Sequence, residues 1–312
     1  MELSIIIPVY NGEKYLNECL NSVFAINKEK SINYEVIVIN DGSTDSSLKI
    51  LEKIKSPVPF RIISQQNKGL SVARNIGISN SNGKFVFFLD CDDYIVPNTF
   101  LDYFNQVKYS NVQVSYANFV YMTNGKIYKT NNIVMSKRII SKISGRTISG
   151  LKFCDSTFNK LNDWARIEVV TSFYNREFLN SKMIRFTEGI LHEDVLFTYS
   201  ILANADEVQY FNKDIYVYRQ NDESIMHNEG IRNYISKYKI ALELYKIKIQ
   251  KNISLVSWDS MIIELLSVSI PYIKMYDKTQ IKCILDKSKK LTLKSILKKI
   301  YIYYLFNNKP IN

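Results

Sequence analysis

Apolar and polar residues alternate in blocks along the first hundred positions of the chain. Short, nearly continuous apolar runs are typical of strands buried on both faces of a sheet, whereas apolar residues three or four positions apart are typical of helices. Apolar residues at helical spacing follow the first two runs, and a short helix is expected after the third. The pattern predicts strands over residues 4–9, 35–39, 60–63 and 85–89.

This order of elements predicts the fold class. Strands that alternate with helices through short links form a mostly parallel, doubly wound α/β sheet of the Rossmann-like kind. Further strands are expected over residues 112–122 and 215–218, and a helical pattern dominates after about residue 232. We therefore expect an α/β domain over residues 1–230 and a helical C-terminal extension over residues 231–312.

Polar residues follow each of the four predicted strands. Asn11 comes after the first strand, Asp41 after the second, Lys68 after the third, and Asp90 and Asp92 after the fourth. In open α/β sheets, ligands bind beyond the carboxyl ends of the strands. We therefore expect these side chains to share one rim and to form a single binding site.

Two carboxylates, Asp90 and Asp92, stand one residue apart directly after five apolar residues. Mg²⁺ and Mn²⁺ prefer oxygen ligands, and Mg²⁺ often takes one or two carboxylates together with phosphate oxygens. The pair therefore indicates a divalent cation that holds a diphosphate. The alternative is a polar turn whose aspartate caps the following helix.

Two neighbouring segments suit a nucleotide. Asp41 can accept hydrogen bonds from a base or ribose, and Arg74 offers a planar cation for phosphate or base edges. Each of the two segments can also be read as a turn followed by the start of a helix.

The glycines between Gly77 and Lys84 do not have phosphate-loop spacing. No GxGxxG pattern follows the first strand, which disfavours a dinucleotide-binding oxidoreductase.

A second acidic pair, Glu193 and Asp194, precedes apolar residues at helical spacing. Negative charge in a first turn favours a helix through its dipole. The functional alternative is that Asp194 is a general base that deprotonates a hydroxyl group. His227, in a polar stretch after the strand expected over residues 215–218, is either a structural histidine or a ligand of a metal or diphosphate.

The net charge of +11 is confined to the end of the chain. Residues 231–312 hold 16 Lys and Arg against 5 Asp and Glu, and residues 1–230 are balanced. An anionic partner near the C-terminus is the simplest explanation. A basic amphipathic pattern over residues 281–306 suits either an anionic membrane surface or a packed helix with a solvated lysine face. No nucleic-acid-binding motif supports nucleic acid as the partner.

The remaining composition indicates a folded protein of a reducing compartment. Hydrophobic residues make up 46% of the chain, which excludes intrinsic disorder. The four cysteines lie far apart and are expected to be free thiols in the cytosol. No apolar run is long enough to span a bilayer, and the first residues lack the basic region of a signal peptide.

Five motifs together resemble family 2 glycosyltransferases with the GT-A fold, of the bacterial capsular and exopolysaccharide type. In chain order these are SIIIPVYN at 4–11, NDGSTD at 40–45, GLSVARN at 69–75, DCDD at 90–93 and the acidic pair at 193–194. The resemblance covers roughly residues 1–230. Cys91 replaces the more usual serine, and residues 163–176 match the family's aromatic and basic pattern only in part.

The resemblance implies inverting transfer of a sugar, usually from a UDP-linked donor, to a hydroxyl of a growing glycan. It places Asp90 near the ribose, Asp92 on a Mn²⁺ or Mg²⁺ ion, and Asp194, with Glu193, at the catalytic base. His227 is a further candidate metal ligand. The residues that we expect at the nucleotide sugar are Pro8, Val9, Tyr10, Asn11, Asp41, Lys68, Gly69, Arg74, Asp90, Cys91 and Asp92.

The acceptor implied by this class and by the basic C-terminus is a lipid-diphosphate-linked oligosaccharide. The enzyme would then work at the cytoplasmic face of the cell membrane as a peripheral protein. Two other classes fit the same residues. One is a non-catalytic module that binds nucleotide sugars or glycans, and the other is a sugar nucleotidyltransferase.

Overall fold

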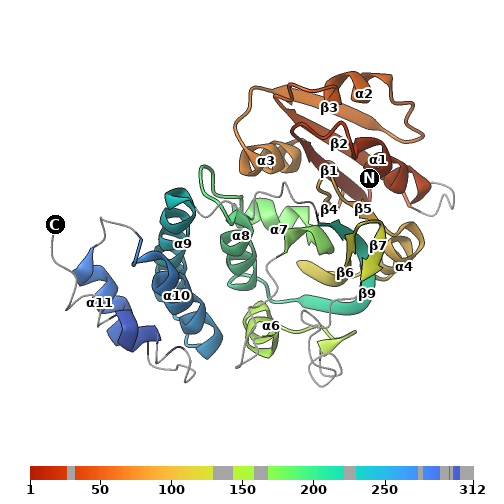
Figure 1. Ribbon diagram of the computed structural model, residues 1–312. Helices are drawn as coiled ribbons and strands as arrows, with labels where there is room; N and C mark the ends of the chain where they lie inside the picture. The colour runs from red at the N-terminus through yellow and green to blue at the C-terminus, as the bar shows by residue number, and fades with distance from the viewer. Residues whose placement is uncertain are drawn as a thin grey trace. The chain divides into compact units, whose positions relative to one another are not determined.

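The computed structural model describes residues 1–26, 32–128, 143–157, 168–220, 230–272, 277–288, 295 and 298–302. Within these residues the chain divides into two compact units, drawn in Figure 1. The first unit comprises Met1–Ser149, Glu168–Gly189 and Ala205–Asp222, and the second comprises Gly150–Ile167, Ile190–Asn204 and Glu223–Asn312. Each unit is described separately. The functional domains expected over residues 1–230 and 231–312 stay a prediction.

The first unit begins with four parallel strands in the order β3-β2-β1-β4, as the apolar blocks predict. β1 pairs with both β2 and β4, and β2 pairs with β3. A helix follows each of the first three strands. The elements are β1 (Leu3–Val9), α1 (Leu16–Phe24), β2 (Tyr34–Asp41), α2 (Ser47–Lys53), β3 (Phe60–Gln65), α3 (Leu70–Asn80) and β4 (Phe85–Phe88).

The sheet continues beyond β4 with mixed strand directions. β8 pairs antiparallel with both β4 and β6, and β9 runs parallel to β6. The short strands β5 and β7 pair antiparallel with β9 and β6. The elements are β5 (Tyr94–Ile95), α4 (Pro97–Val107), β6 (Val114–Thr123), β7 (Lys126–Tyr128), η2 (Val169–Thr171), β8 (Ser172–Asn175), α7 (Arg176–Ser181) and β9 (Val208–Arg219).

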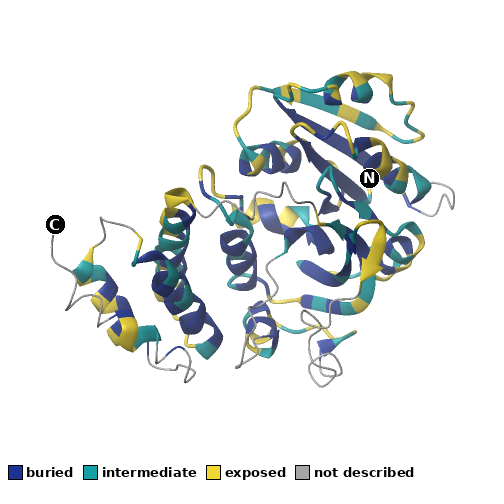
Figure 2. Cartoon of the chain, in the orientation of Figure 1, coloured by how far each residue is buried: buried dark blue, intermediate teal, exposed yellow. Residues whose placement is uncertain are grey.

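The core of the first unit lies on both faces of the central strands. Every residue of β1, β2 and β4 is buried, which Figure 2 shows as dark blue ribbon. Aromatic rings fill one side of β4: the Phe87 ring lies 4.9 Å from that of Phe100 and 5.3 Å from that of Phe173. This burial explains why the strands appear in the sequence as continuous apolar runs rather than as alternating ones.

The second unit is helical where it is described. Trp258 of α10 is fully buried, donates its indole N–H to the Leu244 carbonyl at 3.0 Å, and packs its ring 4.8 Å from that of Tyr199. Lys248 and Asp259 form a buried ion pair beside it. The elements are α6 (Gly150–Thr157), α8 (Glu193–Leu202), α9 (Ile231–Gln250), α10 (Val256–Ser269) and α11 (Lys278–Lys287).

The basic amphipathic segment over residues 281–306 is described only in part. Ile281, Ile284 and Leu285 of α11 are buried, which favours a packed helix for that stretch, whereas Ile300 is 58% exposed. Lys298 pairs with Glu264 of α10. None of the helices that the structure describes has both the length and the apolarity needed to cross a membrane.

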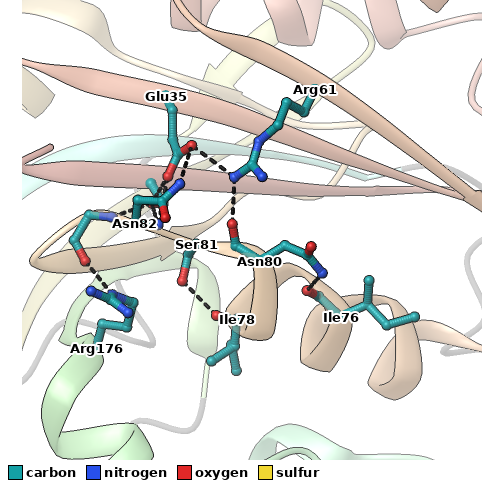
Figure 3. A network of polar contacts seen from close by, with 10 residues as sticks. Glu35, Arg61, Ile76, Ile78, Asn80, Ser81, Asn82 and Arg176 are labelled. Carbon is teal, nitrogen blue, oxygen red and sulfur yellow. Dashed lines mark hydrogen bonds and ion pairs between the residues drawn. The ribbon is translucent and has the colours of Figure 1, made fainter.

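A buried carboxylate joins the amino ends of the parallel strands, whereas the predicted ligand rim lies at their carboxyl ends (Figure 3). Glu35 accepts hydrogen bonds from the Ser4 hydroxyl at 2.7 Å, from the Asn82 backbone N–H at 2.7 Å, and from Arg61 at 2.9 Å. Burial by itself raises the pKa of Glu35, but these donors and the Arg61 charge lower it below its ordinary value. The network joins β1, β2 and β3 to the turn before β4.

Replacing Glu35 with glutamine is therefore expected to destabilise the protein in a pH-dependent way. Hydrogen bonds to charged groups contribute about 1.5–3 kcal/mol each, so we expect the free energy of unfolding at neutral pH to fall by roughly 2–3 kcal/mol. A carboxylate whose folded pKa is lowered stabilises the fold above its unfolded pKa, near 4.3, and loses that contribution as the pH falls through the folded pKa.

Urea unfolding of wild type and Glu35→Gln at neutral pH and at about pH 3.5 checks this expectation, because the difference between the two proteins should shrink at the lower pH. Glu52→Gln is the matched control, since Glu52 is an exposed carboxylate on α2. Equal losses for Glu35→Gln and Glu52→Gln, or a difference that does not change with pH, would contradict the role given to Glu35.

Candidate functional site

Two loops at the carboxyl ends of β1 and β2 are held together by hydrogen bonds from their motif residues. The Asn11 backbone N–H donates to the Ser43 hydroxyl at 3.1 Å, and the Asn11 side-chain oxygen accepts the Thr44 backbone N–H at 2.8 Å. The Gly12 backbone N–H donates to the Ser47 hydroxyl at 2.9 Å. Asn11, predicted to contact the nucleotide, therefore also fixes one loop to the other.

Asp45 strengthens the same junction. Its carboxylate accepts the backbone N–H of Glu13 at 3.0 Å and that of Ser47 at 2.9 Å, and the Glu13 carboxylate accepts the Ser46 N–H at 2.7 Å. Burial raises the pKa of Asp45, but the hydrogen bonds outweigh it and the pKa is lowered. Asp45, the last residue of the NDGSTD motif, therefore has a structural role, because it joins the two loops.

Asp41 organises the loop between β3 and α3. Its buried carboxylate accepts hydrogen bonds from the Gln65 side chain at 2.6 Å, from the Lys68 N–H at 2.8 Å and from the Gly69 N–H at 2.8 Å. Gly69 has a φ of 91°, which favours glycine. The structure thus brings Asp41, Lys68 and Gly69 together, as the sequence predicts. A contact of Asp41 with a base or ribose stays a proposal.

Arg74 of α3 pairs with the first aspartate of the acidic motif. Its guanidinium lies 2.8 Å from the Asp90 carboxylate and 5.2 Å from the centre of the Phe186 ring. Arg74 is 3% exposed, so it is a buried cation at the rim. Gly77 of the same helix has a packing role, because an added Cβ would lie 2.2 Å from the Ile6 side chain.

The acidic turn after β4 contains one structural carboxylate, Asp93. It accepts the Arg219 backbone N–H at 2.7 Å and the Tyr216 hydroxyl at 2.5 Å, both from β9. Burial, together with the negative charges of Asp92 and Asp90, nevertheless raises the pKa of Asp93 well above its ordinary value. Asp93 therefore anchors the turn to β9. The other two carboxylates of the turn are Asp92 and Asp90, and Asp90 already pairs with Arg74.

Arg219 is a residue of this rim to which the sequence assigned no role. Its side chain donates to the Asp92 carbonyl at 2.9 Å and to the Glu18 carboxylate at 2.6 Å. Its guanidinium lies 4.6 Å from the ring centre of Tyr15 and 5.8 Å from that of Tyr94. Arg219 therefore clamps the acidic turn to α1. The only sequence feature that could have indicated this role was an arginine directly after the strand predicted over residues 215–218.

The remaining predicted nucleotide contacts differ in exposure. Pro8 and Val9 are buried in β1, whereas Tyr10 is 51% exposed at the end of that strand. Burial, and then the charges of Asp92 and Asp90, raise the pKa of the Cys91 thiol to about 12. An added Cβ on Gly12 would lie 2.9 Å from the Cys91 sulfur, so this thiol packs beneath the loop after β1.

The donor set at the rim fits a cation that is completed by phosphate oxygens. In the parts of the chain that the structure describes, no three His, Cys, Asp or Glu side chains gather to hold a metal ion. Asp90 and Asp92 offer two carboxylates, which is enough for Mg²⁺ when phosphates supply the other ligands. Burial, with repulsion from Asp90, raises the pKa of Asp92 to about 6, and a bound cation would relieve that repulsion. His227 lies outside the described residues.

The second acidic pair begins α8 in the second unit. The helix starts at Glu193, and the Asp194 carboxylate accepts the Val195 backbone N–H at 3.0 Å. The residue before the helix, His192, has a φ of 59°. The predicted core face of this helix is confirmed: Val195, Leu196, Tyr199 and Leu202 are all buried.

Comparison with known proteins places these features in a family. The sequence profile described as Glycosyl transferase family 2 matches residues 4–163. An uncharacterized glycosyltransferase of Escherichia coli, YibD, is 27% identical over 237 residues, which are 74% of this chain and 66% of that protein. The minor teichoic acid biosynthesis protein GgaA of Bacillus subtilis is 33% identical over 230 residues, which are 70% of this chain and 47% of that protein.

The fold also matches a solved structure. The crystal structure of Staphylococcus aureus TarS residues 1–349, in complex with UDP-GlcNAc, aligns with a TM-score of 0.66 and 24% identity, covering 96% of this chain and 79% of that one. The predicted GT-A fold is confirmed. The predicted enzyme class, a glycosyltransferase, agrees with the name of YibD. The chain spans about two thirds of the length of YibD and about half of that of GgaA. With more than half of its residues matched by the profile, the chain belongs to glycosyl transferase family 2.

Proposed function

We propose that this chain transfers a sugar, with inversion, from a nucleoside-diphosphate donor to a hydroxyl group of a lipid-diphosphate-linked glycan in surface polysaccharide synthesis. The observation that carries the proposal is a shared rim of the sheet. Asp41 ends β2, and the turn with Asp90 and Asp92 follows β4, while both strands run parallel to β1. Arg74 of α3 pairs with Asp90 at this rim. A UDP-linked donor is favoured because the TarS structure of the same fold was determined with UDP-GlcNAc.

At this rim the residues have separate tasks. The exposed Tyr10 ring and the loop held by Asp41 face the nucleoside, and Arg74 adds positive charge next to Asp90. Asp92, with Asp90, would hold a Mn²⁺ or Mg²⁺ ion. When bound, such a cation supplies positive charge that stabilises the departing diphosphate.

Asp194 is proposed as the general base, with Glu193 beside it in the first turn of α8. The acceptor hydroxyl gives its proton to the Asp194 carboxylate while its oxygen attacks the anomeric carbon. The bond from that carbon to the diphosphate breaks on the opposite face of the sugar, so the configuration inverts. The first products are the glycosylated acceptor, the nucleoside diphosphate and the protonated carboxyl group.

Product identity tests this function against its alternatives. The protein is incubated with UDP-, GDP- and dTDP-linked sugars and Mn²⁺, with and without a lipid-diphosphate-linked saccharide, and the released nucleotide is identified. The proposal expects a nucleoside diphosphate. A second incubation, with nucleoside triphosphates and sugar phosphates, tests a sugar nucleotidyltransferase, which would release inorganic diphosphate there. A binding module would release nothing in either incubation. Either of those outcomes contradicts the proposal.

We also propose that the second unit docks on an anionic membrane surface at the cytoplasmic face. One outward face of α9 alternates cations and apolar residues three or four positions apart, and this spacing places them on one side of the helix. Ile235 and Ile249 on this face are 40% and 52% exposed. Apolar side chains among cations suit the surface of an anionic bilayer. The α9 face consists of Arg232, Ile235, Lys239, Leu242, Lys246 and Ile249.

Charge reversal on this face is expected to weaken vesicle binding. Lys239→Glu changes the local charge by two, and each basic residue near an anionic surface contributes about 1 kcal/mol, so we expect roughly tenfold or greater loss of affinity. Sedimentation with phosphatidylcholine vesicles that contain phosphatidylglycerol measures this affinity. Lys53→Glu on α2 is the control, since Lys53 is exposed in the first unit. Equal binding of both variants would contradict the membrane role of α9.

A further inference from the structure

The turn that leads into the acidic pair has an uncommon backbone conformation. His192, the residue immediately before α8, lies in the left-handed region with a φ of 59°. Residues other than glycine adopt this conformation infrequently, because the Cβ atom crowds the backbone. The turn therefore needs contacts from other parts of the fold to hold it, and the Glu193 and Asp194 side chains follow directly from it.

Those contacts come from α9. The Ser236 hydroxyl oxygen accepts the Leu191 backbone N–H at 3.0 Å, and the side-chain oxygen of Asn233 lies 2.9 Å from Nε2 of His192. Two successive residues of the turn are thus held, one by its backbone and the other by its ring. All four residues belong to the second unit.

Asn233 and Ser236 can hold this turn firmly because they are buried and because Ser236 has a further hydrogen bond of its own. Asn233 is 9% exposed and Ser236 is 2% exposed, so water competes little for either contact. The Ser236 hydroxyl donates to the Arg232 carbonyl at 2.8 Å, which leaves its oxygen lone pairs to accept the Leu191 N–H. Asn233 and Ser236 are three positions apart, so they lie on the same side of α9.

We propose that Asn233 and Ser236 are positioning residues for Asp194. By fixing the left-handed turn at His192, they set where α8 begins and how the Asp194 carboxylate is aimed. The inference rests on the proposed role of Asp194 as the base. The family profile ends at residue 163, so it assigns no role to either residue.

Substitution of the two residues tests this role. Ser236→Ala and Asn233→Ala are expected to lower kcat about ten- to hundredfold, since small misplacements of a catalytic group have effects of that size. The donor KM and the affinity for UDP should not change. Ser236→Thr and Asn233→Asp keep an acceptor oxygen at each position and should restore most of the kcat.

Ser269→Ala is the matched control. Ser269 is a fully buried serine of α10 whose hydroxyl donates to the carbonyl four residues earlier, as that of Ser236 does. The hydroxyl of Ser269 bonds only to carbonyls of its own helix in the part of the chain that the structure describes. The melting temperature and kcat are measured for both serine variants. A kcat loss in Ser236→Ala that exceeds that of Ser269→Ala at equal melting temperature supports positioning.

The outcomes separate this inference from the proposed function. If Asp194→Asn stops transfer but Ser236→Ala and Asn233→Ala keep the wild-type kcat, the positioning role is overturned and the base remains. The positioning role is also overturned if the conservative variants lose as much kcat as the alanine variants. If Asp194→Asn retains full turnover, Asp194 is not the base and both proposals fall.

Discussion

Replacing Asp194 with asparagine is expected to lower the turnover of the transferase about 10³-fold. General base catalysis contributes roughly 10²- to 10⁴-fold, and an amide of the same shape cannot take the proton from the acceptor hydroxyl. Asp194 is not among the residues that we assign to the nucleotide, and its proposed task is to take a proton from the acceptor. The variant should therefore bind UDP with unchanged affinity.

Initial rates with saturating donor and acceptor measure the turnover, and calorimetry with UDP measures the nucleotide affinity separately. Asp155→Asn is a suitable control, because Asp155 is an exposed carboxylate of α6 in the same unit. Turnover of Asp194→Asn within about threefold of wild type would remove this residue from the role of base, since a base contributes at least about 10²-fold.

Replacing Asp92 with asparagine is expected to abolish the effect of Mn²⁺ on UDP affinity. Of the three carboxylates in the acidic turn, Asp93 is engaged by Arg219 and Tyr216, and Asp90 pairs with Arg74. Asp92 is therefore the carboxylate that we assign to the cation first. The amide keeps the shape of the side chain but loses the charge that a hard cation requires. We expect the affinity for UDP in Mn²⁺ to fall about 100-fold, to the level without metal, as is typical of lost metal-site interactions.

Calorimetric titration of UDP with Mn²⁺ and with EDTA gives this ratio directly for each protein. Asp102→Asn is the control, because Asp102 is an exposed carboxylate on α4 of the same unit. An Asp92→Asn variant in which Mn²⁺ still strengthens UDP binding as it does in wild type would exclude Asp92 as the metal ligand.

Three strands of the parallel half of the sheet, β1, β2 and β4, could be predicted from sequence because they are buried on both faces. β3 is only partly buried, and the apolar residues Phe60, Ile62 and Ile63 indicated it. The predicted strand over residues 4–9 corresponds to Leu3–Val9, and that over residues 60–63 corresponds to Phe60–Gln65. β9 was recognised only over residues 215–218 although it starts at Val208, because Asn212 and Lys213 interrupt its apolar pattern. The pairing with β6 is also irregular there, between Tyr116 and Phe119. The four-residue strand β8 is too short to show a period.

The rim could be predicted as a set of residues but not as a set of contacts. Asn11 and Asp41 were assigned to the ligand, and in the structure both also hold neighbouring loops through bonds that cross more than twenty positions. Arg219 lies 127 positions from Asp92, and only the placement of β9 in the sheet brings the two together. Such contacts depend on topology, which local patterns do not contain.

A crystal structure of this chain with UDP and Mn²⁺ tests the central claim most directly. We expect the diphosphate at the carboxyl ends of β1, β2 and β4, with a manganese ion bonded to a carboxylate oxygen of Asp92 and to phosphate oxygens. A nucleotide bound elsewhere on the chain, or bound at this rim with Asp90 and Asp92 both turned away from the diphosphate, would contradict it.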